Sequence, residues 1–133
     1  MIDFKIVTPE GRYLEEKVFS IHAKSVMGEF TLLSNHMPVV LSLVPCQLVL
    51  VDEKQEKQDY AISGGILHFH NNSATLLTDA IEGRSEIDIP RAKAALERAK
   101  KRLEKTSDLD TMRRAQLAMQ RAINRLHVSG SSD

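Results

Sequence analysis

The hydrophobic pattern of the chain changes within one stretch, Glu82–Arg98, which reads EGRSEIDIPRAKAALER. Before this stretch, hydrophobic residues tend to alternate with polar ones and turn residues are frequent, as is typical of β-structure. After it, hydrophobic residues recur at helical spacing almost to the end of the chain. The stretch therefore predicts a hinge between two domains, residues 1–84 and 85–133. Its carboxylates and arginines also make it the main candidate site for a small ligand.

The first part of the chain predicts many short strands separated by turns. In the first strand, for example, Ile2, Phe4 and Ile6 alternate with other residues and share one face. We expect strands at Ile2–Thr8, Val18–Lys24, Phe30–Leu33, Val39–Val44, Gln47–Val51, Asp59–Ser63, Ile66–His70 and Ala74–Thr78. This organisation favours a β-sandwich or barrel over residues 1 to about 84.

The second part predicts two helices. One hydrophobic face holds Ala92, Ala95, Leu96, Ala99 and Leu103, and the other holds Met112, Ala115, Met119, Ala122 and Leu126. Asp88 is a candidate cap for the first helix, and Pro90 suits its first turn because an N–H group is dispensable there. Asp108 or Asp110 would cap the second helix, and the tail from about Ser129 is expected to be disordered. The chain as a whole is thus expected to be an α+β protein of two domains.

Alanine dominates the faces along which the two helices would pair. Alanine permits close approach but buries little apolar surface, so the helix hairpin should be only marginally stable by itself. A marginal helix pair attached to a stable sheet domain is what a two-state switch requires. Permanent docking of the hairpin on the sheet fits the pattern equally well.

Charge is distributed unevenly, although the net charge is zero. Residues 1–84 carry 11 acidic and 7 basic side chains, whereas residues 85–133 carry 7 acidic and 11 basic ones. The basic helical part suggests an anionic partner such as phosphate, an acidic protein surface or nucleic acid, or simply attraction between the two parts. Aromatic residues make up only 5% and tryptophan is absent, which argues against a nucleic-acid module that stacks on bases.

Cysteine usage and hydropathy indicate the cellular environment in which the chain is expected to fold. The single cysteine, Cys46, excludes an internal disulfide framework and predicts a reducing environment, and its apolar surroundings favour a core position over a nucleophilic role. The start of the chain lacks a long apolar run, so we expect no signal peptide. The most apolar region, Met37–Val51, is interrupted by two prolines and by polar residues, so we expect no direct membrane insertion.

Motifs for catalysis and metal binding are weak. Gly64-Gly65 lacks the lysine and hydroxyl residue that end a phosphate-binding loop, and is better interpreted as a bend. His68 and His70 share a strand face but have no evident third ligand, so no metal site is expected. No serine, histidine and aspartate set is supported by the sequence, and we therefore expect no catalytic residues.

Arginines are the more informative residues. Arg91, Arg98 and Arg102 follow one another at seven and four residues along one side of the first helix. The second helix repeats this spacing with Arg114, Arg121 and Arg125. If the helices pair antiparallel, both rows can converge on one anion, because guanidinium groups match phosphate oxygens, and Glu82 and Asp88 can accept hydrogen bonds from an amine or a ribose hydroxyl. From spacing alone, two solvated faces with ion pairs, such as Glu97 with Lys93 and Lys101, are the favoured interpretation.

Three stretches together resemble the epsilon subunit of bacterial F-type ATP synthase, and the resemblance spans the chain essentially end to end. They are Gly28-Glu29-Phe30 through His36-Met37-Pro38-Val39, then Ser63-Gly64-Gly65-Ile66-Leu67, and Ile87-Asp88-Ile89-Pro90-Arg91-Ala92. The ending, Arg121-Ala122-Ile123-Asn124-Arg125-Leu126, is similar to the closing helix of the family. One departure is Ser34-Asn35, which stands where the family usually has Pro-Gly. Asparagine tolerates a left-handed backbone, so the turn can survive.

The resemblance implies a flattened N-terminal β-sandwich, a C-terminal antiparallel helix hairpin, and a rotor subunit without an active site. The sandwich would bind the gamma subunit and rest on the membrane c-ring. By the same resemblance, Glu29 and His36 are expected to contact the ring and gamma. The chain would then be a peripheral membrane protein on the cytoplasmic face of the bacterial cell membrane.

The resemblance also implies that the hairpin switches between a folded and an extended state. The extended state would reach the alpha and beta catalytic subunits and inhibit ATP hydrolysis, with Arg113, Arg114 and Arg121 facing an acidic segment of beta. No cofactor would be required, but ATP would stabilise the folded state as a regulatory ligand. The ATP site implied in this way comprises Glu82, Ile87, Asp88, Arg91, Ala92, Arg98, Arg121 and Arg125.

Two other functions remain open at this point. A stand-alone nucleotide-sensing domain would share the arginine site but would not retain gamma. A nucleic-acid binder would use the basic helices and would show salt-sensitive binding, although the composition argues against it.

Overall fold

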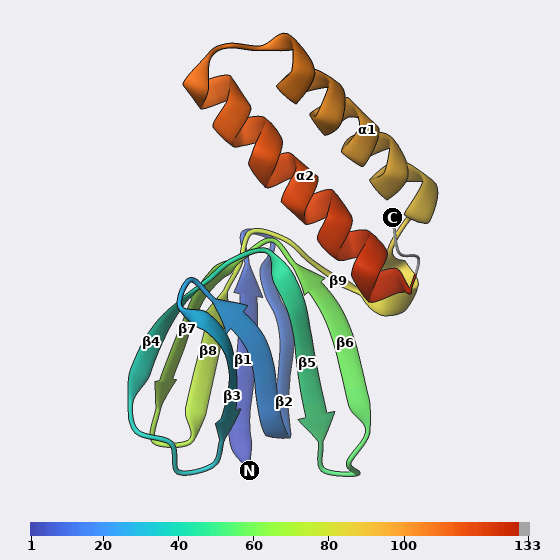
Figure 1. The fold of residues 1–133 in the computed structure, drawn as a ribbon. Helices are drawn as coiled ribbons and strands as arrows, with labels where there is room; N and C mark the ends of the chain where they lie inside the picture. The colour runs from blue at the N-terminus through green and yellow to red at the C-terminus, as the bar shows by residue number, and fades with distance from the viewer. Residues whose placement is uncertain (131–133) are drawn as a thin grey trace. The chain divides into compact units, whose positions relative to one another are not determined.

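The computed structural model describes residues 1–130 of the 133-residue chain. Contacts between Cα atoms divide the chain into two compact units, Met1–Gly83 and a second that begins at Arg84, and each is described here by itself (Figure 1). The first unit is the β-sandwich and the second is the helix hairpin, as expected for the α+β fold.

Over the described residues 1–83, the β-sandwich is built from nine strands, eight of which overlap the expected ones. Their bounds are β1 Ile2–Thr8, β2 Gly11–Ser25, β3 Gly28–Leu33, β4 Val39–Leu43, β5 Cys46–Asp52, β6 Lys57–Ile62, β7 Gly65–His70, β8 Ser73–Leu77 and β9 Ile81–Gly83. The pattern did not predict β9, which is three residues long and too short to show alternation.

The long strand β2 belongs to both layers of the sandwich. Its first half pairs with β1 from Gly11 to Val18, whereas its second half pairs with β3 and β5 (Figure 1). One layer therefore runs β2-β1-β8-β7-β4 and the other runs β3-β2-β5-β6-β9. The pairings are antiparallel except for β1 with β8, which is parallel.

The predicted bounds of β2 were wrong at its start. We expected Val18–Lys24, but the strand begins at Gly11. The residues in between are mostly charged and lie largely at the surface, so they give no hydrophobic alternation, and their pairing with β1 holds them extended. Tertiary pairing overrides local propensity here.

The core of the sandwich consists of large hydrophobic side chains contributed by both layers. Phe4 and Phe69 are the largest of the fully buried side chains, and isoleucines and leucines surround them. Cys46 is buried in the same cluster, which confirms its predicted core position. Burial raises the pKa of the Cys46 thiol, so it stays protonated and unreactive.

Two turns of the sandwich rely on left-handed backbone at asparagine. Asn71 and Asn72 join β7 to β8 with φ of 50° and 59°, the conformation of a type I′ hairpin turn. Asn35, in the turn after β3, has φ of 68°. The expectation that this turn survives with asparagine is confirmed.

The second unit begins with a 3₁₀ turn, η1 Arg84–Glu86, followed by α1 Ile89–Lys105 and α2 Leu109–Ser129. Asp88 and Asp108 cap the two helices, so Asp108 rather than Asp110 is the second cap. Predicted disorder from Ser129 was wrong for the residues described, because Ser129 is helical and Gly130 ends α2 with a left-handed cap. Residues 131–133 lie outside the described part.

The hairpin seam is small, as its alanine content predicts. Its buried cluster consists of Ala92, Leu96, Ala122 and Leu126, with Ile89, Ala95 and Met119 partly buried against it. Within the described residues, neither helix is long and apolar enough to cross a membrane.

Candidate functional site

The residues Ile87-Asp88-Ile89-Pro90-Arg91-Ala92 form the start of α1, and each has a local structural role. The Oδ1 atom of Asp88 accepts a hydrogen bond from the backbone N–H of Arg91 at 3.1 Å, which satisfies one of the free donors at the helix end. Ile87 and Ala92 are buried, at 8% and 2% exposure, whereas the Arg91 side chain is exposed. The motif thus fixes the start of α1 and leaves the Arg91 side chain at the surface.

The two arginine rows have the same relation to the seam. In both helices the arginine stands one position before a buried or half-buried seam residue, as the pairs Arg91-Ala92, Arg98-Ala99, Arg102-Leu103, Arg114-Ala115, Arg121-Ala122 and Arg125-Leu126 show. Two antiparallel helices are related by a twofold axis perpendicular to the plane that contains them. Residues with the same offset from the seam therefore lie on the same side of that plane in both helices. Both rows therefore flank the same side of the seam.

Three of the predicted ATP-site arginines lie along the same part of the hairpin. Arg91, Arg121 and Arg125 are each adjacent in sequence to Ala92, Ala122 or Leu126, which pack in one cluster. Arg98 lies further along α1, next to the buried Ala99. The structure thus places Arg91, Arg121 and Arg125 beside one buried cluster of the hairpin.

Three of the four predicted ATP-site arginines have no acidic partner in the described part of the chain. The side chains of Arg91, Arg98 and Arg121 make no ion pair within residues 1–130. The expected pairing of Glu97 with Lys93 and Lys101 was wrong, because the Glu97 carboxylate lies 3.9 Å from the Lys100 ammonium group. Arginine side chains that have no ion-pair partner are able to bind a polyanion.

Two other members of the predicted ATP site, Ala92 and Glu82, are less exposed than the arginines. Ala92 packs in the hairpin cluster, so its side chain contributes shape rather than polar contact. Glu82 is half-buried on β9, opposite Ala61 of β6, and belongs to the first unit. The predicted beta-subunit contacts Arg113, Arg114 and Arg121 are all exposed on α2.

Glu29 lies in the first half of β3, and His36 lies beyond the end of that strand. Glu29 is at the start of β3, with its side chain 72% exposed and 3.7 Å from His22 Nε2. His36 follows the end of β3; its ring packs edge-to-face on Phe69 at 5.9 Å between centroids. At about 3.3 Å per residue, the strand rises roughly 13 Å from Glu29 to Leu33, so the two residues are associated with opposite ends of β3.

Asn72, in the turn between β7 and β8, holds the loop after β3, and sequence reasoning missed this contact. Its Oδ1 atom accepts from the backbone N–H of Asn35 at 2.6 Å, and its Nδ2 group donates to Asn35 Oδ1 at 3.1 Å. The two residues are 37 positions apart, so only the turn-forming Asn71-Asn72 dipeptide gave any signal. This double hydrogen bond fixes the loop that carries His36.

Carboxylates and potential metal ligands are also present among the described residues. Among residues 1–130, no group of three or more histidines, cysteines and carboxylates is arranged to hold a metal ion. A hollow lined by Glu16, Lys17, Asp52, Glu53, Lys54 and Glu56 is acidic. Burial, together with the Asp52 charge, raises the pKa of Glu16 in that hollow.

Family models match both units. The model of the ATP synthase delta/epsilon chain β-sandwich domain matches residues 1–84, and that of the delta/epsilon chain long α-helix domain matches residues 85–130. An ATP synthase epsilon chain from Pediococcus pentosaceus is 37% identical, covering 97% of this chain and 95% of that protein. The epsilon chain of Ligilactobacillus salivarius is 32% identical with the same coverage.

Solved structures agree with this relationship. A chain in the mitochondrial ATP synthase of Euglena gracilis, solved with OSCP, F1 and c-ring, superposes with a TM-score of 0.80 at 26% identity, over 90% of this chain and 75% of that one. A chain in the central stalk and c-ring structure from Tetrahymena thermophila shares the fold, with a TM-score of 0.71 at 17% identity over 96% of both chains. With two matching units and relatives aligned nearly end to end, the chain belongs to the delta/epsilon-chain family of ATP synthase subunits, and within it to the bacterial epsilon chains.

Proposed function

We propose that the chain is a non-catalytic central-stalk subunit of a bacterial ATP synthase that restrains ATP hydrolysis through its helix hairpin. The sandwich binds the gamma subunit and bridges to the c-ring, with Glu29 and His36 at those contacts. The subunit is peripheral, on the cytoplasmic face of the membrane. Family membership and the exposed basic residues of α2 support this proposal.

ATP is the regulatory ligand in this proposal, and no cofactor is required. The observation that carries it is the pair of arginine rows on one side of a weak seam, next to the Asp88 cap. ATP bound by Arg91, Arg98, Arg121 and Arg125 would join α1 to α2 and favour the folded hairpin. A ligand shifts such an equilibrium only by its difference in affinity for the two states.

The first experiment is calorimetric titration of the full chain with ATP, with and without magnesium. We expect wild-type binding, and an affinity about ten to a hundred times lower for Arg91→Ala, because a hydrogen bond to a charged group is lost. Arg113→Ala is the matched control, since Arg113 is also exposed but lies outside both rows. Unchanged binding by Arg91→Ala would remove Arg91 from the site.

The capping role of Asp88 needs a separate control, because Asp88→Ala would also weaken α1. Asp88→Asn keeps a side-chain oxygen for the Arg91 N–H but removes the charge. If this variant retains helicity but changes ATP affinity, the carboxylate acts on the ligand. If both are unchanged, Asp88 is a cap alone.

The rotary role is tested with the catalytic assembly. We expect the wild-type chain to be retained by purified gamma, and to slow ATP hydrolysis by an F1 assembly that lacks its own epsilon subunit. Replacing Arg113, Arg114 and Arg121 together by glutamine should relieve that inhibition while gamma binding persists. A stand-alone nucleotide sensor would bind ATP but would not be retained by gamma.

A further inference from the structure

The helix hairpin has one closed end and one open end. Residues 106–108 join α1 to α2 at the closed end, whereas α1 begins and α2 ends at the open end. The 3₁₀ turn η1, which leads into α1, contacts α2 and lies beside the last turn of that helix (Figure 1). Two segments that are far apart in the sequence therefore meet at the open end of the hairpin.

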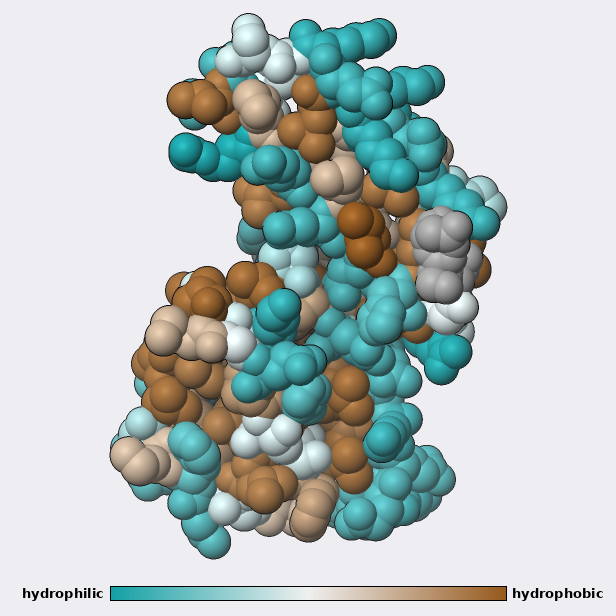
Figure 2. All heavy atoms as spheres, viewed as in Figure 1, coloured by the Kyte–Doolittle hydropathy of each residue, from teal (hydrophilic) through white to brown (hydrophobic). Residues whose placement is uncertain are grey.

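The rest of the hairpin is weak enough for one contact at this end to matter. The buried cluster between the helices is small, and Figure 2 shows hydrophilic side chains along the outer side of α1. Arg91, Arg121 and Arg125, which we propose to bind ATP, lie toward the same open end. A modest interaction there can shift an equilibrium between a paired and an opened hairpin.

Arg84, the first residue of η1, places its guanidinium group against Gly130. A Cβ atom added to Gly130 would lie 3.0 Å from a terminal guanidinium nitrogen of Arg84 and 3.9 Å from the Cζ atom. Gly130 ends α2 in the left-handed conformation, and its N–H donates to the His127 carbonyl at 3.1 Å. Any larger residue at this position would crowd the guanidinium group, whereas glycine lets it approach the helix end.

The end of α2 attracts a positive charge. The last carbonyl groups of a helix lack partners within it and carry partial negative charge, so a cation beside them is stabilising. His127 is a basic residue of the last turn of α2 itself, and Arg84 brings a second from another segment. Because Arg84 precedes α1 and Gly130 ends α2, this contact exists only while the two helices are paired.

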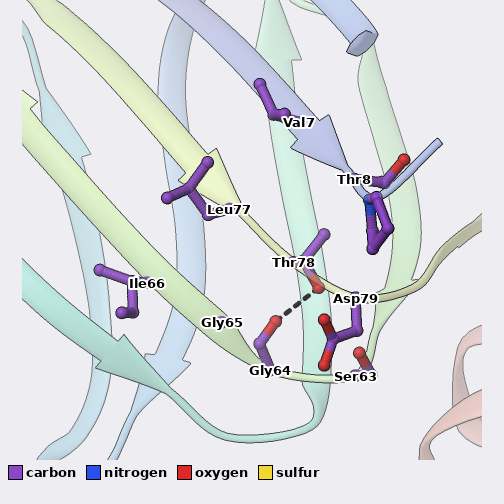
Figure 3. Close-up of a pocket in the computed structure, with 10 residues that line it drawn as sticks. Val7, Thr8, Ser63, Gly64, Gly65, Ile66, Leu77, Thr78 and Asp79 are labelled. Carbon is purple, nitrogen blue, oxygen red and sulfur yellow. Dashed lines mark hydrogen bonds between the residues drawn. The ribbon is translucent and has the colours of Figure 1, made fainter. Parts of the chain in front are cut away.

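A close approach in the sandwich shows by contrast that the contact at Gly130 can be released. At Gly65 an added Cβ atom would collide with the backbone of β8, and the Thr78 hydroxyl donates to the Gly64 carbonyl at 2.6 Å (Figure 3). Backbone atoms there cannot separate without disrupting the pairing of β7 with β8. At Gly130 the nearest atoms belong to the far end of the exposed Arg84 side chain, which can rotate away.

We infer that Arg84 is a latch, a side chain whose charge at the end of α2 holds the open end of the folded hairpin. The guanidinium group must leave Gly130 before the hairpin extends. This inference rests on the proposed function where it concerns extension. The latch acts in the same direction as bound ATP, so it sets how readily the hairpin opens when ATP is scarce.

Amide hydrogen exchange of the full chain tests the latch. Arg84→Ala should speed exchange in the last turns of α2 about two- to fivefold, because a charge at the helix end is lost and exchange follows the opening equilibrium. The difference from wild type should shrink at high salt, which screens that charge. Arg84→Lys keeps the charge and should retain most of the protection. Lys101→Ala is the matched control, since Lys101 is also exposed but lies near the middle of α1.

A double-mutant cycle tests the contact itself. Gly130→Ala puts a methyl group against the guanidinium group and also forces alanine into left-handed backbone. The backbone cost is the same with and without the Arg84 side chain, whereas the crowding disappears in Arg84→Ala. Gly130→Ala should therefore speed exchange less in the Arg84→Ala background. Equal effects in the two backgrounds, or unchanged exchange in Arg84→Ala at low salt, would overturn the latch.

An F1 assembly that lacks its own epsilon subunit separates the latch from the proposed function. Wild type should slow ATP hydrolysis by this assembly, Arg84→Ala should slow it further because the hairpin extends more readily, and Lys101→Ala should resemble wild type. If wild type inhibits and Arg84→Ala inhibits no more strongly, the latch has no part in extension. Absence of inhibition by wild type would contradict the proposed function, while hydrogen exchange would still decide whether Arg84 holds the end of α2.

Discussion

The sandwich and the hairpin differ in how much hydrocarbon they bury. The sandwich encloses two fully buried phenylalanines among isoleucines and leucines from both layers. The hairpin cluster holds two leucines and two alanines. At about 25 cal/mol per Å², each large side chain contributes about 1.5–3 kcal/mol, whereas an alanine methyl group contributes far less.

This difference indicates which unit a ligand can control. A ligand present at a hundred times its dissociation constant stabilises the bound state by about 2.7 kcal/mol. That energy is comparable with the contribution of one or two buried leucines of the hairpin cluster and small compared with the sandwich core. We therefore expect ligands to bias the hairpin while the sandwich stays folded.

The largest expected effect is in the sandwich. Phe69→Ala should lower its free energy of unfolding by about 3–5 kcal/mol, because the fully buried ring leaves a cavity. Urea unfolding followed by circular dichroism measures the loss. Phe19→Ala is the control, since Phe19 is 46% exposed and should change stability much less. Equal losses in the two variants would contradict the view that this core dominates.

A smaller effect is expected in the hairpin, but it should be confined to the helices. Leu96→Ala removes one of the two leucines of the seam and should cost about 2 kcal/mol, the lower end for such a change. Amide hydrogen exchange should then accelerate in α1 and α2 and remain slow in the strands. Leu109→Ala, at a position 73% exposed, serves as the control. Faster exchange in the strands would show that the two units unfold together.

The smallest effect concerns pH and Glu16. Its pKa is raised above the ordinary 4.5 by burial and by the Asp52 charge, and its Oε1 atom is buried without a hydrogen-bond partner among the described residues. The folded state therefore prefers the protonated carboxyl, and this preference is lost as pH rises from about 4.5 through the folded-state pKa.

Glu16→Gln should remove that loss, so its stability relative to wild type should increase over the same pH range. Because Glu16 is partly exposed, solvent screening limits the gain to less than about 1 kcal/mol. Asp52→Asn removes the Asp52 charge but leaves Glu16 buried, so it should give only part of the gain in stability. Urea unfolding at several pH values measures this change in the free energy of unfolding. If that free energy depends on pH in the same way for wild type and Glu16→Gln, the Glu16 carboxyl is not the cause of the loss.

Sequence patterns predicted those features that depend on neighbouring residues. Alternation located the core strands. Cap chemistry placed the start of α1 at Asp88 and narrowed the start of α2 to Asp108 or Asp110, of which the structure has Asp108. Gly130 also carried a signal, since glycine is common just past a helix end, and weighing it would have placed the end of α2 correctly.

Features that depend on distant parts of the chain gave no such signal. The first half of β2 is held by β1, and β9 exists only through pairing with β6. The same is true of the Asn35 and Asn72 hydrogen bonds. In the arginine site, the spacing predicted the rows, but the absence of ion pairs for Arg91 depended on where the acidic side chains lie in space.

The continuous course of β2 through both layers has a mechanical consequence. In a sandwich whose layers touch only through side chains, a pulling force separates them once the hydrophobic contacts yield. Here the force must also act along an unbroken covalent backbone, and the hydrogen bonds of β2 to β1 on one side and to β3 and β5 on the other share the load. The two layers should therefore transmit torque as one body and resist shearing apart.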